Sequence, residues 1–182
     1  MIQYAAFLRG INVGGNVLIK MEDLRKTLES IKLKNVKTIL ASGNVVFEAT
    51  ETNPETLTKT IEQKLAKTFG RHIGVILRTM DEIIALIDAN PFKSINVTKD
   101  TRLYITFLKE KPSKNAGLKI PYESPQKNFR ILEMTNNSLV SVLTLLPNIG
   151  TVDAMNIIEK TYGKKVTTRN WNTIQKIATK KN

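Results

Sequence analysis

The sequence predicts an α+β fold of two tandem ferredoxin-like subdomains, each with the element order β-α-β-β-α-β, with a linking helix and a C-terminal helix. Short apolar runs alternate with stretches whose apolar residues recur every three or four positions, which is typical of strands alternating with amphipathic helices. This order is clear in the first half and returns with weaker signals in the second. We therefore expect subdomains at 1–78 and 101–182, joined by a helical connector at 79–100.

Start and stop signals support each element of the first half. A glycine-rich loop separates the first strand from a helix whose apolar residues fall at i, i+3, i+7 and i+10. Ser42-Gly43-Asn44 is typical of a tight turn between two strands. Asn53 and Pro54 are a typical cap and first residue of a helix, which Gly70 ends. The expected strands are 2–8, 36–40, 45–47 and 73–77, and the expected helices are 21–31 and 54–69.

The second half follows a capping box from Thr79 to Glu82, which opens the connecting helix. Asn90-Pro91 ends that helix. The pair Asn136-Asn137 tolerates positive φ and predicts a hairpin between its flanking strands. We expect strands at 103–108, 129–134, 139–145 and 165–167, helices at 112–118, at 151–163 and from about Arg169, and a loop at 119–127.

The composition is that of an ordinary globular protein, with 182 residues of which 41% are hydrophobic. The absence of cysteine excludes disulfides, thiolate metal sites and cysteine nucleophiles. No apolar run approaches the length that spans a bilayer, and the N-terminus lacks the basic and apolar segments of a signal peptide. We expect a cytosolic protein with no membrane partner.

The net charge of +12 and the pI near 9.9 favour anionic partners. Residues 1–78 carry 12 Lys/Arg against 7 acids, and residues 79–182 carry 16 against 9, so the excess is spread along the chain. Only the C-terminal end is locally dense in basic residues. A lysine-rich surface that keeps the protein soluble explains this charge as well as a nucleic-acid interface does.

The glycine-rich loop at 9–16 is the main candidate site, and its expected binding residues are Arg9, Asn12, Gly14 and Gly15. Two of its glycines have the spacing of a phosphate-binding loop, but Asn and Val follow where Lys and Ser/Thr are needed. Acids at the start of the next helix would also repel an anion there. These features disfavour nucleotide hydrolysis. They still allow a loop whose backbone N–H groups bind an anion without hydrolysing it. Alternatively, the glycines only permit a tight crossover, and Arg9 pairs with a local acid.

Asn44, Arg169 and Asn170 complete the set of candidate ligand-binding residues. We expect Arg169 and Asn170 in the exposed first turn of the last helix, beside N–H groups that could hold an anion. The alternative is a threonine cap followed by Trp171 as a core anchor. His72 is the single histidine, and without nearby carboxylate or cysteine spacing we expect it to be structural. Aromatic residues make up only 6% of the chain, so base stacking on the sheet is weakly supported.

Five segments together resemble the domain-of-unknown-function family sixteen ninety-seven: FLRGINVGG, MEDLRKTL, ASGNVVF, ANPF and TTRNWNT. The resemblance extends over nearly the whole chain. It implies a compact bacterial-type cytosolic protein with ferredoxin-like α/β subdomains, and no established activity or catalytic residues. In the family pattern a strand ends in Tyr-Tyr-Pro before a basic run. Residues 145–153 lack this character here, so a family site in that segment would be altered or lost.

The favoured function is a non-catalytic binding module for an anionic partner, either a nucleic acid or a phosphorylated small molecule. One rival is an enzyme acting on a small acidic substrate, with Arg9 and Asn12 positioning that substrate. Another is a structural or protein-interaction module. We expect no cofactor and no metal, because neither a cofactor motif nor metal-ligand spacing is present. We also expect segments 9–16 and 167–173 to flank one concavity.

Overall fold

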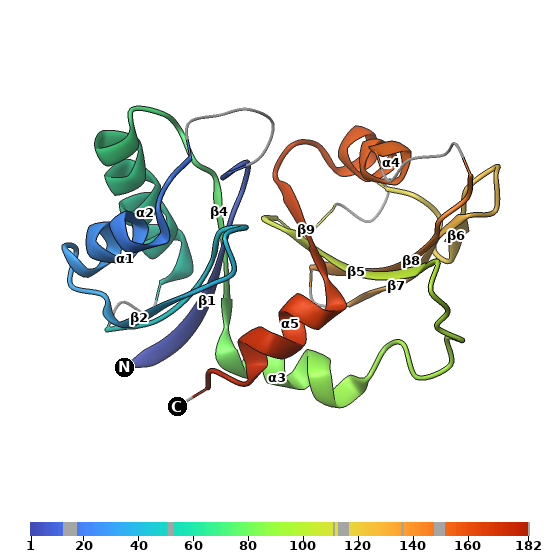
Figure 1. Ribbon diagram of the computed structural model, residues 1–182, viewed down its shortest axis with the longest axis horizontal. Helices are drawn as coiled ribbons and strands as arrows, with labels where there is room; N and C mark the ends of the chain where they lie inside the picture. The colour runs from blue at the N-terminus through green and yellow to red at the C-terminus, as the bar shows by residue number, and fades with distance from the viewer. Residues whose placement is uncertain are drawn as a thin grey trace. The chain divides into compact units, whose positions relative to one another are not determined.

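The computed structural model describes residues 1–12, 18–50, 53–110, 112, 117–135, 137–147 and 152–181. Within these residues the fold is mixed α+β, with two antiparallel sheets and five helices (Figure 1). The chain forms two compact units. The first unit comprises Met1–Asp88 with Gln175–Asn182, and the second comprises Ala89–Ile174. The expected division into 1–78, 79–100 and 101–182 stays a prediction about independent folding.

The sheet of the first unit has four strands in the order β2-β3-β1-β4, with every neighbouring pair antiparallel. Each of the four strands expected in the first half is confirmed within two or three residues at either end. The central strand β1 therefore has a partner on both sides, β3 and β4. The strands are β1 (Ile2–Leu8), β2 (Lys34–Ile39), β3 (Asn44–Ala49) and β4 (Val75–Thr79).

The helices of the first unit are α1 (Met21–Glu29), α2 (Pro54–Phe69) and α3 (Met80–Ala89). The Asn53 side chain accepts hydrogen bonds from the backbone N–H groups of Glu55 and Thr56, at 2.9 and 3.2 Å, which confirms the expected cap of α2. The capping box of α3 is also confirmed. Glu82 Oε2 accepts the Thr79 N–H at 2.7 Å, and Thr79 Oγ1 accepts the Glu82 N–H at 3.2 Å.

The core of the first unit lies between its sheet and the helices α1 and α2, which share one side of the sheet (Figure 1). Alternate residues of each strand face these helices, because successive side chains of a strand point to opposite faces. Each fully buried leucine or phenylalanine contributes roughly 1.5–3 kcal/mol. The largest contributors are Phe47 on the sheet and Leu24, Leu28, Ile61 and Leu65 on the helices.

The second unit repeats the strand order of the first with one strand added. Its sheet runs β6-β7-β8-β5-β9, so β7-β8-β5-β9 corresponds to β2-β3-β1-β4. Helix α4 packs on one face of this sheet (Figure 1). The elements are β5 (Thr101–Leu108), β6 (Tyr122–Glu123), β7 (Phe129–Thr135), β8 (Ser138–Thr144), α4 (Val152–Tyr162), β9 (Val166–Asn170) and α5 (Trp171–Ala178).

Four expectations for the second half need correction or lie beyond the described residues. The expected loop at 119–127 contains the short strand β6, which pairs with β7. The last helix begins at Trp171 instead of near Arg169, because 166–170 continue as a strand that pairs with β5. The expected helix at 112–118 falls mostly outside the described residues, and its described positions, 112, 117 and 118, are not helical. The expected cap Thr151 also lies outside them.

Asn53→Ala should lower the free energy of unfolding by about 1 kcal/mol, because two N–H groups at the start of α2 lose their acceptor. Urea denaturation followed by circular dichroism measures the effect. Asn53→Asp keeps a side-chain acceptor and should stay close to the wild type. An alanine variant as stable as the aspartate variant would contradict this assignment of the cap.

Candidate functional site

The end of β1 is held by glycine backbone on both sides. The Leu8 N–H donates to the Gly43 carbonyl and the Arg9 N–H donates to the Gly74 carbonyl, each at 2.8 Å. Two side chains lie close to Gly74. A Cβ at this position would lie 3.8 Å from Arg9 Cβ and 3.9 Å from His72 Cε1. Arg9 and His72 therefore flank one glycine, and Arg71 precedes His72 on the same connection between α2 and β4.

Asn12 closes the loop that leaves β1. Its amide Nδ2 donates to the carbonyls of Ile19, at 3.0 Å, and Ala41, at 3.1 Å, and its Oδ1 accepts the Ile19 N–H at 2.7 Å. Its backbone has a φ of 56°, a conformation that asparagine tolerates better than most residues. The side chain thus ties both ends of the loop to the turn between β2 and β3. Its expected role in ligand binding stays a prediction, and Gly14 and Gly15 lie outside the described residues.

Asn44 stands at the start of β3, opposite Phe7 in the sheet register. Its side chain is fully buried and donates from Nδ2 to the Ile39 carbonyl and to Ser42 Oγ, both at 3.0 Å. These bonds shape the turn that also receives Asn12. The structure therefore gathers Arg9, Asn12 and Asn44 at one end of the first unit, and both amides bond to the protein itself.

Arg169 and Asn170 are the last residues of β9, in the second unit, opposite Ile105 and Tyr104 of β5. Their expected position in an exposed helical turn is wrong, because the strand pairing continues through both. Arg169 Nη1 donates to Thr167 Oγ1 at 2.8 Å and to the Thr168 carbonyl at 2.9 Å. Burial lowers the pKa of the Arg169 guanidinium to about 10, which still leaves it charged at neutral pH. Whether segments 9–16 and 167–173 share a concavity stays a prediction.

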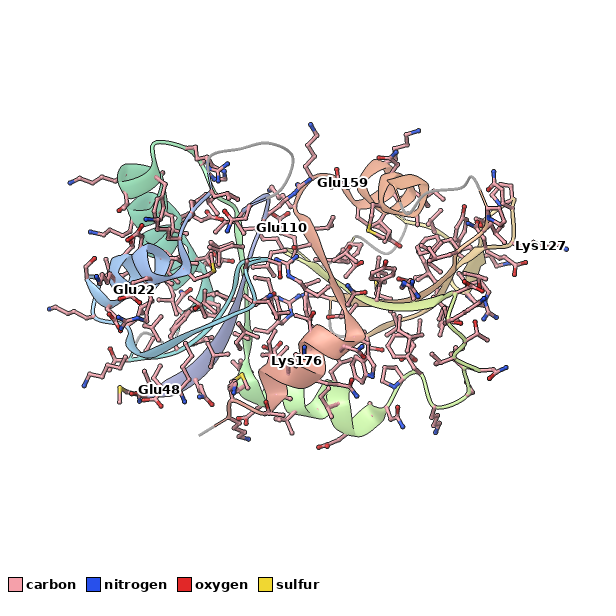
Figure 2. The ribbon with its side chains drawn as sticks, viewed as in Figure 1. Glu22, Glu48, Glu110, Lys127, Glu159 and Lys176 are labelled. Carbon is pink, nitrogen blue, oxygen red and sulfur yellow. The ribbon has the colours of Figure 1, made fainter. Side chains whose placement is uncertain are left out.

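The surface charge of both units is mixed. Acidic side chains, including Glu22 on the first unit and Glu110 on the second, lie among the lysines (Figure 2). Lys165 Nζ donates to Glu110 at 2.6 Å, and this hydrogen bond lowers the pKa of Glu110 and raises that of Lys165. The net charge alone therefore does not identify a binding site. A site for an anion requires a local cluster of basic side chains.

A groove in the second unit was not anticipated from the sequence. It encloses about 530 Å³ between the segment 91–96 and the face of the second sheet that does not carry α4. Arg130 and Glu133 of β7 line it, with Val142 of β8 among the apolar residues. The adjacent apolar residues Ile131 and Leu132 interrupt the alternation of β7, and this interruption was the available sequence signal.

The described residues contain no group of three or more His, Cys, Asp or Glu side chains that could hold a metal ion. None of the described helices combines the length and the apolar character needed to cross a membrane. Tyr4 of β1 and Phe47 of β3 are buried in the core beneath α1 and α2. These two rings are therefore not available for stacking on bases.

Comparison with known proteins identifies a family. A sequence model described as "Protein of unknown function (DUF1697)" matches residues 1–134, which confirms the expected family. The segment TTRNWNT at 167–173 lies outside the matched residues. A solved structure, "The structure of conserved bacterial protein SP0830 from Streptococcus pneumoniae", is similar with a TM-score of 0.63 and 21% sequence identity. The similarity covers 98% of this chain and 97% of that chain, and it shows a shared fold. No curated protein matches the sequence.

Gly43→Ala should destabilise the protein by about 2–4 kcal/mol, because two costs combine. Gly43 has a φ of 76°, and an added Cβ would overlap the Ile11 side chain and lie 3.0 Å from Leu8 Cβ. Overpacking costs typically 1–3 kcal/mol and the left-handed backbone costs about 1 kcal/mol more.

Gly70→Ala is the matched control, because Gly70 has a φ of 68° but open space around its missing Cβ. It should cost only about 1 kcal/mol. Chemical denaturation of both variants measures the difference. Equal losses of stability would show that the approach of Ile11 to the turn does not constrain residue 43.

Proposed function

We propose that this chain, which belongs to the family described as "Protein of unknown function (DUF1697)", is a non-catalytic binding module for an anionic partner. The partner carries phosphate groups, as either a nucleic acid or a phosphorylated small molecule. The observation that supports this proposal most strongly is that Arg9 and His72 both lie close to Gly74 at the end of β1. Arg71 directly precedes His72 in the chain and adds a second guanidinium group to this segment. Guanidinium groups suit phosphate because their planar fork can donate two hydrogen bonds to it.

One acidic residue, Glu62, lies near these basic residues. Glu62 of α2 accepts a hydrogen bond from the Val75 N–H at 2.9 Å, at the start of β4. This hydrogen bond leaves the carboxylate with its full charge, so one acid stands against the two arginines. The excess of positive charge favours an anionic ligand at the end of β1 from which the glycine-rich loop departs.

Phosphate contact fits the first unit better than base recognition does. An RNA-recognition sheet stacks bases on exposed aromatic residues. Tyr4 and Phe47 are buried in the core against α1 and α2, which leaves Phe7 as the single other aromatic residue on β1 and β3. We therefore favour contacts with the backbone of a nucleic acid, or with the phosphates of a small molecule. Such contacts give a strong dependence of affinity on salt concentration.

The rival function as an enzyme receives less support from the described residues. An enzyme acting on a small acidic substrate was expected to use Arg9 and Asn12, but the Asn12 amide bonds to backbone at both of its polar atoms. We retain as part of the proposal a cytosolic location and an arrangement of two ferredoxin-like subdomains. The strand order shared by the two sheets supports this arrangement.

Fluorescence anisotropy with labelled single-stranded RNA, duplex DNA and a labelled nucleoside triphosphate tests the proposal at about 50 and about 200 mM salt. The wild type should bind at least one probe at the lower salt concentration. The double variant Arg9→Gln, Arg71→Gln should weaken that binding about tenfold or more. It should also reduce the salt slope by about 2, one unit for each phosphate that the variant no longer neutralises.

Lys59→Gln is the matched control. Lys59 is exposed on α2, ten residues before the end of that helix, which is about 15 Å along the helix axis. Its substitution removes one positive charge from the same unit and should reduce affinity only slightly. Absence of binding by the wild type at low salt, or equal losses of affinity in both variants, would overturn the proposal.

A further inference from the structure

The groove of the second unit has the size of a ligand site. Its volume of about 530 Å³ lies within the range of small-molecule pockets, roughly 300–1,000 Å³. One wall is the segment 91–96, which forms two consecutive turns. The Lys93 N–H donates to the Asn90 carbonyl at 3.1 Å, and the Ile95 N–H donates to the Phe92 carbonyl at 2.9 Å. The buried ring of Phe92 packs edge-on against Trp171, 5.2 Å between centroids, and anchors this wall.

A β-bulge in β7 determines which side chains line the opposite wall of the groove. In the register of β7 with β8, Ile131 lies opposite Ser141 but Glu133 lies opposite Val140, so Leu132 is an extra residue. Regular alternation would place Glu133 on the core face with Ile131. The bulge instead turns Glu133 to the face of Arg130, as bulges do where a side chain must be re-aimed. Both charged residues consequently line the groove.

The spacing of these two charges is fixed by the neighbouring strand. Arg130 lies opposite Val142 and Glu133 opposite Val140, two residues apart along β8. At about 3.3 Å per residue, the two side chains leave the sheet roughly 7 Å apart. Among the described residues no ion pair joins them. The groove thus offers one positive and one negative group at a defined separation.

Other side chains of the groove can contact the part of a peptide-like ligand that lies between its two charged ends. Ser94 and Asn96 are exposed on the wall segment and can bond a peptide group. Thr101 is less available, because its Oγ1 already accepts the Thr98 N–H at 3.0 Å. Val142 is buried and gives the groove an apolar lining on which a small side chain can pack.

We propose that this groove binds a zwitterionic ligand of dipeptide size, with its carboxylate on Arg130 and its ammonium group on Glu133. Two extended residues span at most about 7 Å, which matches the separation of the two charged side chains. Arginine forms paired hydrogen bonds with a carboxylate, and glutamate accepts from an ammonium group. A phosphate ester fits less well, because Glu133 would repel it. The proposal is independent of the anion site in the first unit.

Isothermal titration calorimetry with alanyl-alanine tests this proposal directly. The full-length protein should bind the dipeptide saturably. It should bind acetylated alanyl-alanine, which lacks the ammonium group, and alanyl-alanine amide, which lacks the carboxylate, at least tenfold more weakly. Arg130→Gln should abolish the preference for the free carboxylate, and Glu133→Gln should abolish the preference for the free ammonium group.

Lys160→Gln is the charge-matched control, since Lys160 is exposed on α4, the helix that packs on the other face of the sheet. It should leave all three affinities unchanged, and thermal melts should show that every variant is folded. The proposal is overturned if the wild type shows no saturable binding of alanyl-alanine. It is also overturned if the three ligands bind equally, or if the Arg130 and Glu133 variants keep the preferences of the wild type.

Discussion

The clamping of the end of β1 between two glycines determines the geometry of the first unit's candidate site. β1 lies between β3 and β4 in the sheet. At its end, the Leu8 N–H donates to the Gly43 carbonyl just before β3, and the Arg9 N–H donates to the Gly74 carbonyl just before β4. Gly43 permits the approach of Ile11, and Arg9 and His72 both lie close to Gly74. After the end of β1, Asn12 ties the chain to the β2–β3 turn through its hydrogen bond to the Ala41 carbonyl. The position of the basic cluster follows from this backbone arrangement.

The second unit uses the same strand order for a different surface. There β5 takes the central place of β1, but the feature that bears chemistry lies on β7, the counterpart of β2. A single extra residue in β7 turns Glu133 out of the core and beside Arg130. The repeated topology therefore supplies two scaffolds, and small local deviations, a pair of glycines in one and a bulge in the other, give them separate candidate sites. This division is consistent with function being carried by sites rather than by a fold.

Features that depend on nearby residues were predictable from the sequence. The caps at Asn53 and Thr79 were found correctly because each bond spans two or three residues. The partners of long-range hydrogen bonds and strand pairings were not predictable. Asn12 bonds across 7 and 29 residues, to Ile19 and Ala41, and no local pattern indicates those partners. Arg169 was assigned to a helix because the following residues have helical periodicity, whereas pairing with the distant β5 extends the strand through it. The bulge at Leu132 likewise depends on the register with β8.

The central claim is that an anionic partner binds at the clamped end of β1, and nuclear magnetic resonance can locate that contact. A ¹⁵N-labelled sample titrated with a nucleoside triphosphate at low salt reports which backbone amides sense the ligand. We expect the largest shifts at 8–10 and at 71–75, on the two segments that meet at the hydrogen bond between the Arg9 N–H and the Gly74 carbonyl. Shifts confined to other surfaces, with the amides of Arg9, Arg71 and Gly74 unmoved at saturation, would contradict it.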